Sequence, residues 1–229
     1  SIIPLSSIPG AASLDDLPPV KTMGILNRDE GIDACVPGIV KFTSPSQAAG
    51  YFMLGETSKT SAAGKERGKT RSPFTQPFFP LQFGLQATRF KELAATMPEV
   101  TMWMMNTGYI GGTSADTESG DALKVKIRHS SAMLEAMLSE KIVWKLDEDF
   151  GYLVVDVDDI ANAHLLEKVP HEILSPKSFY KSQGREDDYN MWVLKMHKER
   201  REFLSSYSVD EQIISSVCTP STKLSGRTK

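Results

Sequence analysis

The sequence is poor in cysteine, with only Cys35 and Cys218 among its 229 residues. Two cysteines so far apart form neither a disulfide framework nor a zinc-binding pattern, and a reducing cytoplasm is the compartment that we expect. No apolar run approaches the roughly 18 residues that a transmembrane helix needs, so no membrane-spanning helix is predicted. The first residues show no basic stretch leading into an apolar core, and we expect no secretory signal there.

The sequence also lacks an excess of charge of either sign. Its 26 lysines and arginines nearly balance 29 aspartates and glutamates, which gives a formal net charge of −3. This balance provides no electrostatic attraction to nucleic acid or to an anionic membrane, and neither is expected as a partner. The 40% of hydrophobic and 24% of charged residues instead describe an ordinary globular protein with a sizeable core.

Metal-binding patterns are missing as well. The four histidines are scattered without ligand spacing: His129, His164, His171 and His197. The aspartates at 156–159 lack the glycine and the terminal glutamate of a calcium loop, so we interpret them as a solvated turn. No metal site is predicted from these residues.

The segment 64–70 resembles a phosphate-binding loop but does not match it. The motif G-x-x-x-x-G-K-[ST] requires four residues between its glycines, whereas Gly64 and Gly68 are separated by three. Those three residues are bulky and charged, and they would crowd the backbone amides that should hold phosphate. The sequence therefore lacks the element that holds the β- and γ-phosphates of a nucleotide.

The most informative stretch that is present runs from residue 100 to residue 112. It begins as an apolar run, typical of a strand buried on both faces, and turns abruptly polar at Asn106-Thr107-Gly108. An alternating segment at 123–127 follows a glycine-containing loop and predicts a strand with one polar face. Ser130 or Ser131 then caps a predicted helix. This order indicates a ligand-facing edge of an α/β sheet, because ligands gather at strand ends.

A second segment, 57–76, is polar and basic. It follows a predicted helix that starts at Ser44-Pro45-Ser46-Gln47 and stops near Gly55. A loop of this length inside a domain is usually either functional or disordered. Its basic residues are Lys59, Lys65, Arg67, Lys69 and Arg71.

Shorter patterns describe the rest of the chain. Strands are predicted at 20–25, 141–144 and 152–157, helices near 87–94, 189–203 and 209–217, and a loose tail at 218–229.

Several segments, in order along the chain, resemble the C-terminal part of ATP-dependent phosphoenolpyruvate carboxykinase. They are 52–59, 66–68, 106–112, 124–132, 134–138, 150–152, 169–170 and 173–176. The resemblance spans roughly residues 1 to 207, and several matches in one order are more specific than any single short pattern.

The resemblance implies an α/β fold, a mixed sheet with flanking helices that forms the later part of the family's nucleotide-binding domain, here residues 1–217. The implied reaction converts oxaloacetate and ATP to phosphoenolpyruvate, CO2 and ADP. By comparison, nucleotide contacts fall on Lys124, Val125 and Ser130, and the segment 57–76 becomes a lid over the active site. At the position of Lys124 the family usually has arginine. Lysine keeps the positive charge but lacks the planar guanidinium group.

The same resemblance assigns the other parts of the enzyme to positions outside this sequence. The phosphate loop, the ligands of the divalent metal (manganese or magnesium) and a substrate-binding arginine would precede Ser1. We therefore expect a fragment, a processed piece or one half of a split enzyme, inactive by itself and partnered by the missing N-terminal part. The alternative is a noncatalytic module for nucleotide sensing or partner binding that retains half of the fold.

Overall fold

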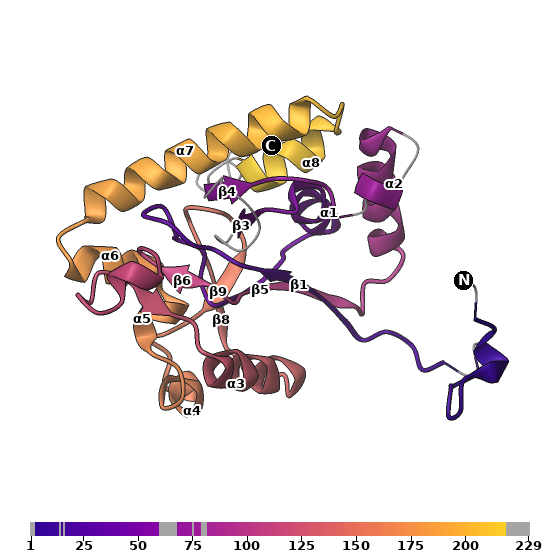
Figure 1. Ribbon diagram of the computed structural model, residues 1–229, viewed down its shortest axis with the longest axis horizontal. Helices are drawn as coiled ribbons and strands as arrows, with labels where there is room; N and C mark the ends of the chain where they lie inside the picture. The colour runs from indigo at the N-terminus through magenta and orange to yellow at the C-terminus, as the bar shows by residue number, and fades with distance from the viewer. Residues whose placement is uncertain are drawn as a thin grey trace, which may run out of the picture.

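The computed structural model describes residues 3–13, 15, 17–59, 68–74, 76–78 and 82–218. Its centre is a five-stranded mixed sheet (Figure 1). The strand order is β1 (Thr22–Asn27), β5 (Thr101–Asn106), β2 (Ile39–Lys41), β9 (Leu153–Val155) and β8 (Trp144–Leu146). β1 and β5 run parallel, and the other neighbours run antiparallel. The predicted α/β fold with a mixed sheet is confirmed.

Helices cover both faces of this sheet (Figure 1). One layer consists of α1 (Pro45–Leu54), α2 (Phe83–Ala95), α7 (Glu186–Ser205) and α8 (Glu211–Cys218). The opposite layer contains α3 (Ile127–Leu138) and α4 (Ala163–Leu166), and the short helices α5 (His171–Leu174) and α6 (Pro176–Ser182) connect it to α7. Among the described helices, none combines the length and the apolar character that crossing a membrane requires.

α1 forms where its local sequence predicts a helix. The Ser44 hydroxyl accepts a hydrogen bond from the Gln47 amide at 3.1 Å, and Pro45 occupies the first turn. The helix ends at Gly55, whose φ of 45° lies in the left-handed region. A Cβ at that position would also meet the carbonyl oxygen of Ser72, so glycine both ends the helix and admits the returning chain.

β5 is the buried strand predicted from the apolar run after residue 100. Its residues from Trp103 to Asn106 are all buried, with sheet neighbours on both sides. The Trp103 ring lies against Gly24 of β1, where a Cβ would come within 2.2 Å of it. The two parallel strands therefore fit together because β1 carries no side chain at that point.

The segment after β5 differs from its prediction. β7 (Leu123–Lys124) pairs with β6 (Tyr109–Ile110) in a separate two-stranded sheet, so the predicted strand 123–127 is too long. α3 starts at Ile127 with Lys126 at its N-cap, and the prediction of a cap at Ser130 or Ser131 is wrong. The physical reason is that β6 offers only two residues for pairing, after which the chain turns into the helix.

The segment 57–76 is not a continuous loop. Its ends form β3 (Thr57–Lys59) and β4 (Gly68–Thr70), which pair antiparallel as a hairpin. Residues 60–67 lie outside the described part of the chain. At the C-terminal end, α8 includes Cys218, and residues 219–229 of the predicted tail also lie outside the described part.

Candidate functional site

Asn106, the last residue of β5, organises the polar turn at the end of that strand. Its side chain is 0% exposed, and Oδ1 accepts hydrogen bonds from the amides of Asp29 (3.0 Å) and Gly108 (2.8 Å). Nδ2 donates to the carbonyl oxygens of Val36 (3.0 Å) and Tyr109 (3.1 Å). A buried amide with all of these partners holds two distant segments of the chain in one rigid arrangement.

Gly108 lies directly against the backbone of Asp29. A Cβ on Gly108 would come within 2.0 Å of the Asp29 carbonyl oxygen, so only glycine fits this position. The same carbonyl accepts a hydrogen bond from the Tyr109 amide at 2.7 Å, and the Gly108 carbonyl accepts one from the Val125 amide at 2.9 Å. The turn thus joins the segment around Asp29 to the predicted nucleotide-binding residues.

Lys124 and Val125 lie on β7 and immediately after it. Pairing of β7 with β6 places Lys124 opposite Tyr109. The Lys124 ammonium donates to the Tyr109 hydroxyl at 3.1 Å and lies 5.0 Å from the centre of its ring. Lys124 is exposed, whereas Val125 is buried. Because the Val125 amide is already bonded to Gly108, a ligand that reaches its backbone meets only the carbonyl oxygen.

Ser130 lies in the first turn of α3 and is half-buried. Since Lys126 occupies the N-cap, the Ser130 hydroxyl is not used to cap the helix. Within the described part of the chain it has no hydrogen-bond partner, which leaves it available to a ligand. The structure therefore places Lys124, Val125 and Ser130 on one strand-to-helix connection.

Lys69, in β4, forms a buried ion pair with Asp29. Its ammonium nitrogen lies 2.8 Å from Asp29 Oδ1, and the two side chains are 7% and 2% exposed. The other carboxylate oxygen accepts a hydrogen bond from the Val36 amide at 3.0 Å. Burial raises the pKa of the Asp29 carboxyl, and Lys69 opposes that effect more strongly than any other group. Asp29 therefore connects the β3–β4 hairpin to the Asn106 turn.

Glu56, between α1 and β3, accepts hydrogen bonds from two arginines. Arg71 Nε donates to Oε2 at 2.7 Å, and Arg200 Nη2, from α7, donates to Oε1 at 2.8 Å. Arg71 also reaches Glu199 at 3.0 Å, and the Arg200 guanidinium lies over the Tyr51 ring. Burial acts to raise the pKa of Glu56, but the arginines outweigh it and hold that pKa far below its usual range. This second ion-pair network fixes the hairpin to α7.

The predicted basic residues of the lid thus fall into two groups. Lys69 and Arg71 neutralise buried carboxylates at the base of the hairpin, with side chains 7% and 11% exposed, and they do not extend into solvent. Lys59 lies on β3, whereas Lys65 and Arg67 lie outside the described residues.

Sequence reasoning missed Asp29, Glu56 and Arg200. Arg200 belongs to a charged run at 198–202, which is typical of a solvated helix face, and yet its side chain is 1% exposed. The partners of all three residues lie far away in the sequence, so no local pattern distinguishes them from ordinary surface charges. The only local hint was the cluster of basic residues at 65–71, which requires acidic partners somewhere in the fold.

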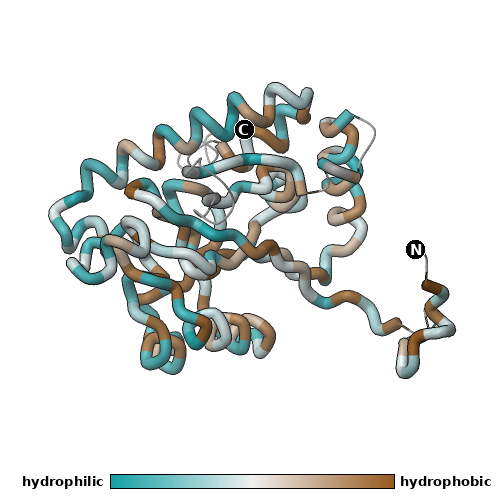
Figure 2. The backbone as a smooth tube through the Cα atoms, in the orientation of Figure 1, coloured by the Kyte–Doolittle hydropathy of each residue, from teal (hydrophilic) through white to brown (hydrophobic). Residues whose placement is uncertain are grey.

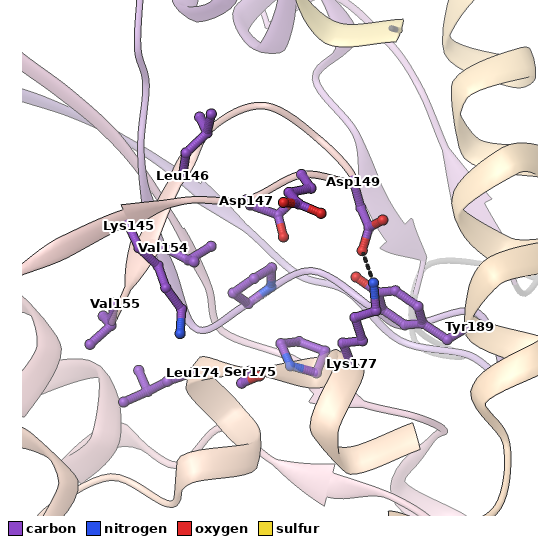
Figure 3. A pocket seen from close by; sticks show the side chains of 13 residues that line it. Lys145, Leu146, Asp147, Asp149, Val154, Val155, Leu174, Ser175, Lys177 and Tyr189 are labelled. Carbon is purple, nitrogen blue, oxygen red and sulfur yellow. Dashed lines mark hydrogen bonds and ion pairs between the residues drawn. The ribbon is translucent and has the colours of Figure 1, made fainter. Parts of the chain in front are cut away.

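A cavity of about 250 Å³ lies elsewhere, between the β8–β9 hairpin and the starts of α6 and α7 (Figure 3). Both lysines that line it are already paired. Lys145 lies 2.9 Å from both Asp156 and Asp158, and Lys177 lies 3.0 Å from Asp149. Neither lysine offers an unneutralised charge to a nucleotide phosphate, and none of the predicted nucleotide-binding residues lines this cavity.

The fold and the polar turn define an α/β protein in which a buried strand is followed by a hydrogen-bonded turn and a strand-to-helix connection. Residues 2–162 match the family model described as phosphoenolpyruvate carboxykinase, and the chain belongs to this family. The match contains every strand of the central sheet and the whole Asn106 turn.

Curated relatives agree with this assignment. The chain is 31% identical over 198 residues to a protein of Bradyrhizobium diazoefficiens named phosphoenolpyruvate carboxykinase (ATP), a match that covers 82% of this chain and 33% of the relative. A protein of the same name from Allorhizobium ampelinum is 34% identical over 161 residues, covering 66% of this chain and 28% of the relative. The chain spans about a third of the length of the curated relatives that it matches.

Proposed function

We propose that this chain supplies the nucleotide-base-binding wall and the base of the lid in an ATP-dependent phosphoenolpyruvate carboxykinase. In that reaction oxaloacetate loses CO2, the resulting enolate oxygen attacks the γ-phosphorus of ATP, and ADP departs, leaving phosphoenolpyruvate. The observation that carries the proposal is the Asn106 turn. Hydrogen bonds of Gly108 and Tyr109 link this turn to Val125 and Lys124, and Ser130 follows in the first turn of α3.

Each of the three residues has a distinct task in this proposal. The Lys124 ammonium provides positive charge at the edge of the base, and its bond to the Tyr109 hydroxyl limits its movement. Val125 presents its backbone carbonyl oxygen to the base, since its amide is engaged. Ser130 supplies a hydroxyl from the first turn of α3. These groups bind and orient the nucleotide, and none of them is placed in the bond-making step.

The lid is part of the same proposal. The β3–β4 hairpin is a fixed base, held by the Lys69–Asp29 pair and by the two arginines on Glu56. In this proposal Lys65 and Arg67 contribute positive charge to the lid, which helps to exclude water from the enolate.

The divalent metal of the family does not fit the residues described here. Within residues 3–218, leaving aside the undescribed gaps, no three histidine, cysteine, aspartate or glutamate side chains are placed to hold a metal ion. The phosphate loop and the metal ligands belong to the part of a carboxykinase that this sequence does not contain, and the isolated chain is expected to be inactive.

The test is the replacement of Lys124 by alanine in the assembled enzyme. Loss of one charged hydrogen-bonding group typically costs about 1–3 kcal/mol, or about 5- to 150-fold in affinity. Because Lys124 acts in binding, the variant should raise KM for ATP by this factor and leave kcat nearly unchanged. Lys124→Arg should retain or improve ATP binding, since the guanidinium restores a planar donor fork.

Lys141→Ala provides the control, because Lys141 is also an exposed lysine and lies beyond the end of α3. It should alter neither kinetic constant. A strong loss of kcat in Lys124→Ala at saturating ATP would place the residue in the transition state and contradict the assigned role. Unchanged constants in both variants would mean that Lys124 is an ordinary surface lysine.

A further inference from the structure

A cavity of about 360 Å³ lies at the end of the central sheet where β1 and β5 begin. Its walls are the starts of these two strands, the end of β2, the start of β8 and the C-terminal end of α3. α3 lies below the sheet in Figure 1, and the same helix carries brown, hydrophobic stretches in Figure 2. The length of β5 separates this cavity from the Asn106 turn by roughly 17 Å. It is therefore distinct from the nucleotide site.

The pairing register places four of the lining residues on one face of the sheet. Thr22 of β1 is paired with Thr101 of β5. Two residues further along β5, Trp103 is paired with Lys41 of β2, and side chains two residues apart in a strand lie on the same face. The register of β9 with its two neighbours puts Trp144 of β8 on this face as well. Residues from four separate segments thus meet beneath the end of α3.

Lys21 and Lys41 make the polar part of the cavity positive. Within the described part of the chain neither lysine has an ion-pair partner. The Thr22 hydroxyl accepts a hydrogen bond from Trp103 Nε1, so its own hydrogen remains available for donation. The carboxylate of Glu140, an exposed residue, also lines the cavity. Two ammonium groups and one carboxylate leave a net positive charge.

The remaining wall is apolar. Met137 and Ile142 are buried, Trp144 is half-buried, and Leu138 is exposed at the end of α3. A concave apolar wall with a few polar donors at one side is the usual composition of a site for a small organic molecule. An inorganic ion would use the lysines and leave the indole ring uncovered, whereas a flat organic anion would contact both.

We propose that this cavity binds a small organic anion, a carboxylate or phosphate group attached to a flat apolar body. The anionic group lies between Lys21 and Lys41 and accepts from the Thr22 hydroxyl, and the body packs against Trp144. The ligand is bound and released unchanged. This site is independent of the proposed nucleotide site, because Lys124, Val125 and Ser130 do not line the cavity.

The experiment uses phenyl phosphate and benzoate, which carry the two possible anionic groups on the same ring, and benzyl alcohol as the uncharged comparison. Each is titrated into the 15N-labelled full chain while NMR follows the indole N–H signals. We expect at least one of the two anions to move the Trp144 signal, assigned with Trp144→Phe, to saturation. The anion with the lower Kd identifies the preferred group. Trp192, on α7 across the sheet, should not respond.

Lys21→Ala and Lys41→Ala should each raise Kd by about fivefold or more, because each removes a charged hydrogen-bond donor. The control is Lys198→Ala, whose lysine is 77% exposed on α7 and should not affect Kd. Glu140→Gln should lower Kd by removing a like charge, and a higher Kd would contradict the assignment to a simple anion. The inference is overturned if neither anion moves the Trp144 signal, if benzyl alcohol moves it equally, or if the two lysine variants bind as the unaltered chain does. Equal thermal melting shows that the variants fold.

Discussion

Replacing Lys69 with methionine tests whether the β3–β4 hairpin is fixed by its buried ion pair with Asp29. Methionine retains most of the apolar stem of lysine and removes only the charge. The Asp29 carboxylate, 2% exposed, would then have the Val36 amide at 3.0 Å as its hydrogen-bond donor and, among the described residues, no cation paired with it. The variant therefore isolates the effect of an unpaired buried charge.

The expected loss of stability is large. Removing one partner of a buried ion pair typically costs about 3–5 kcal/mol. For a chain of this size, about 2–4 °C of Tm corresponds to each kcal/mol, so Tm should fall by about 6–20 °C. The matched control is Lys195→Met, whose lysine lies 3.7 Å from Glu199 and is 48% exposed. An exposed pair of that kind contributes about 0–1 kcal/mol.

The pH dependence provides a second measurement. Burial already raises the pKa of the Asp29 carboxyl, and loss of Lys69 raises it further. An acid whose pKa is higher in the folded chain than in the unfolded chain contributes stability that is lost as pH rises through the folded pKa. The loss of unfolding free energy in Lys69→Met should therefore be smaller at pH 5 than at pH 8.

Urea unfolding, followed by tryptophan fluorescence at both pH values, measures these differences. Adding Asp29→Asn to Lys69→Met should recover part of the loss, because the amide oxygen still accepts from Val36 and carries no charge. If Lys69→Met costs no more than Lys195→Met, or if its deficit is the same at both pH values, the Asp29 pair does not fix the hairpin.

Two further predictions concern other residues of the fold. Burial raises the pKa of Asp147 from 3.8 to about 6, so its ionised form destabilises the folded chain as pH rises through about 6. Asp147→Asn should therefore raise Tm at pH 8 and leave it unchanged at pH 4, and a gain at both values would contradict this cause. Gly108→Ala should cost about 1–3 kcal/mol in urea unfolding, because the new Cβ meets the Asp29 carbonyl oxygen at 2.0 Å. An unchanged free energy of unfolding would mean that the turn shifts to accommodate the added Cβ.

Local sequence patterns predicted elements whose stabilising contacts are also local. α1 begins and ends where Ser44, Pro45 and Gly55 place its boundaries, because a helix cap involves neighbouring residues. The long apolar run predicted the buried strand β5 for a similar reason. The mixed sheet and the family could also be predicted from the sequence, because the resemblance rests on short segments that match in the same order along the chain.

Other boundaries depended on distant partners. A strand was predicted at 141–144, but β8 runs from Trp144 to Leu146. The Asn162 side chain accepts from the Val143 amide at 3.0 Å and donates to the Val143 carbonyl at 2.8 Å, so a side chain occupies the groups that a strand would use. The strand predicted at 123–127 was shortened in the same way, because β6 pairs with only two of its residues.

The sequence by itself determined the family, the order of the main elements and the positions of Lys124, Val125 and Ser130 on one strand-to-helix connection. Only the tertiary structure decided that Lys69 and Arg71 point inward to Asp29 and Glu56, and that Arg200 is buried although it belongs to a charged run. The physical reason is that the free energy of a charged side chain depends on its partner and on its distance from water. Both are set by segments far apart in the chain, whereas caps and apolar runs are set by adjacent residues.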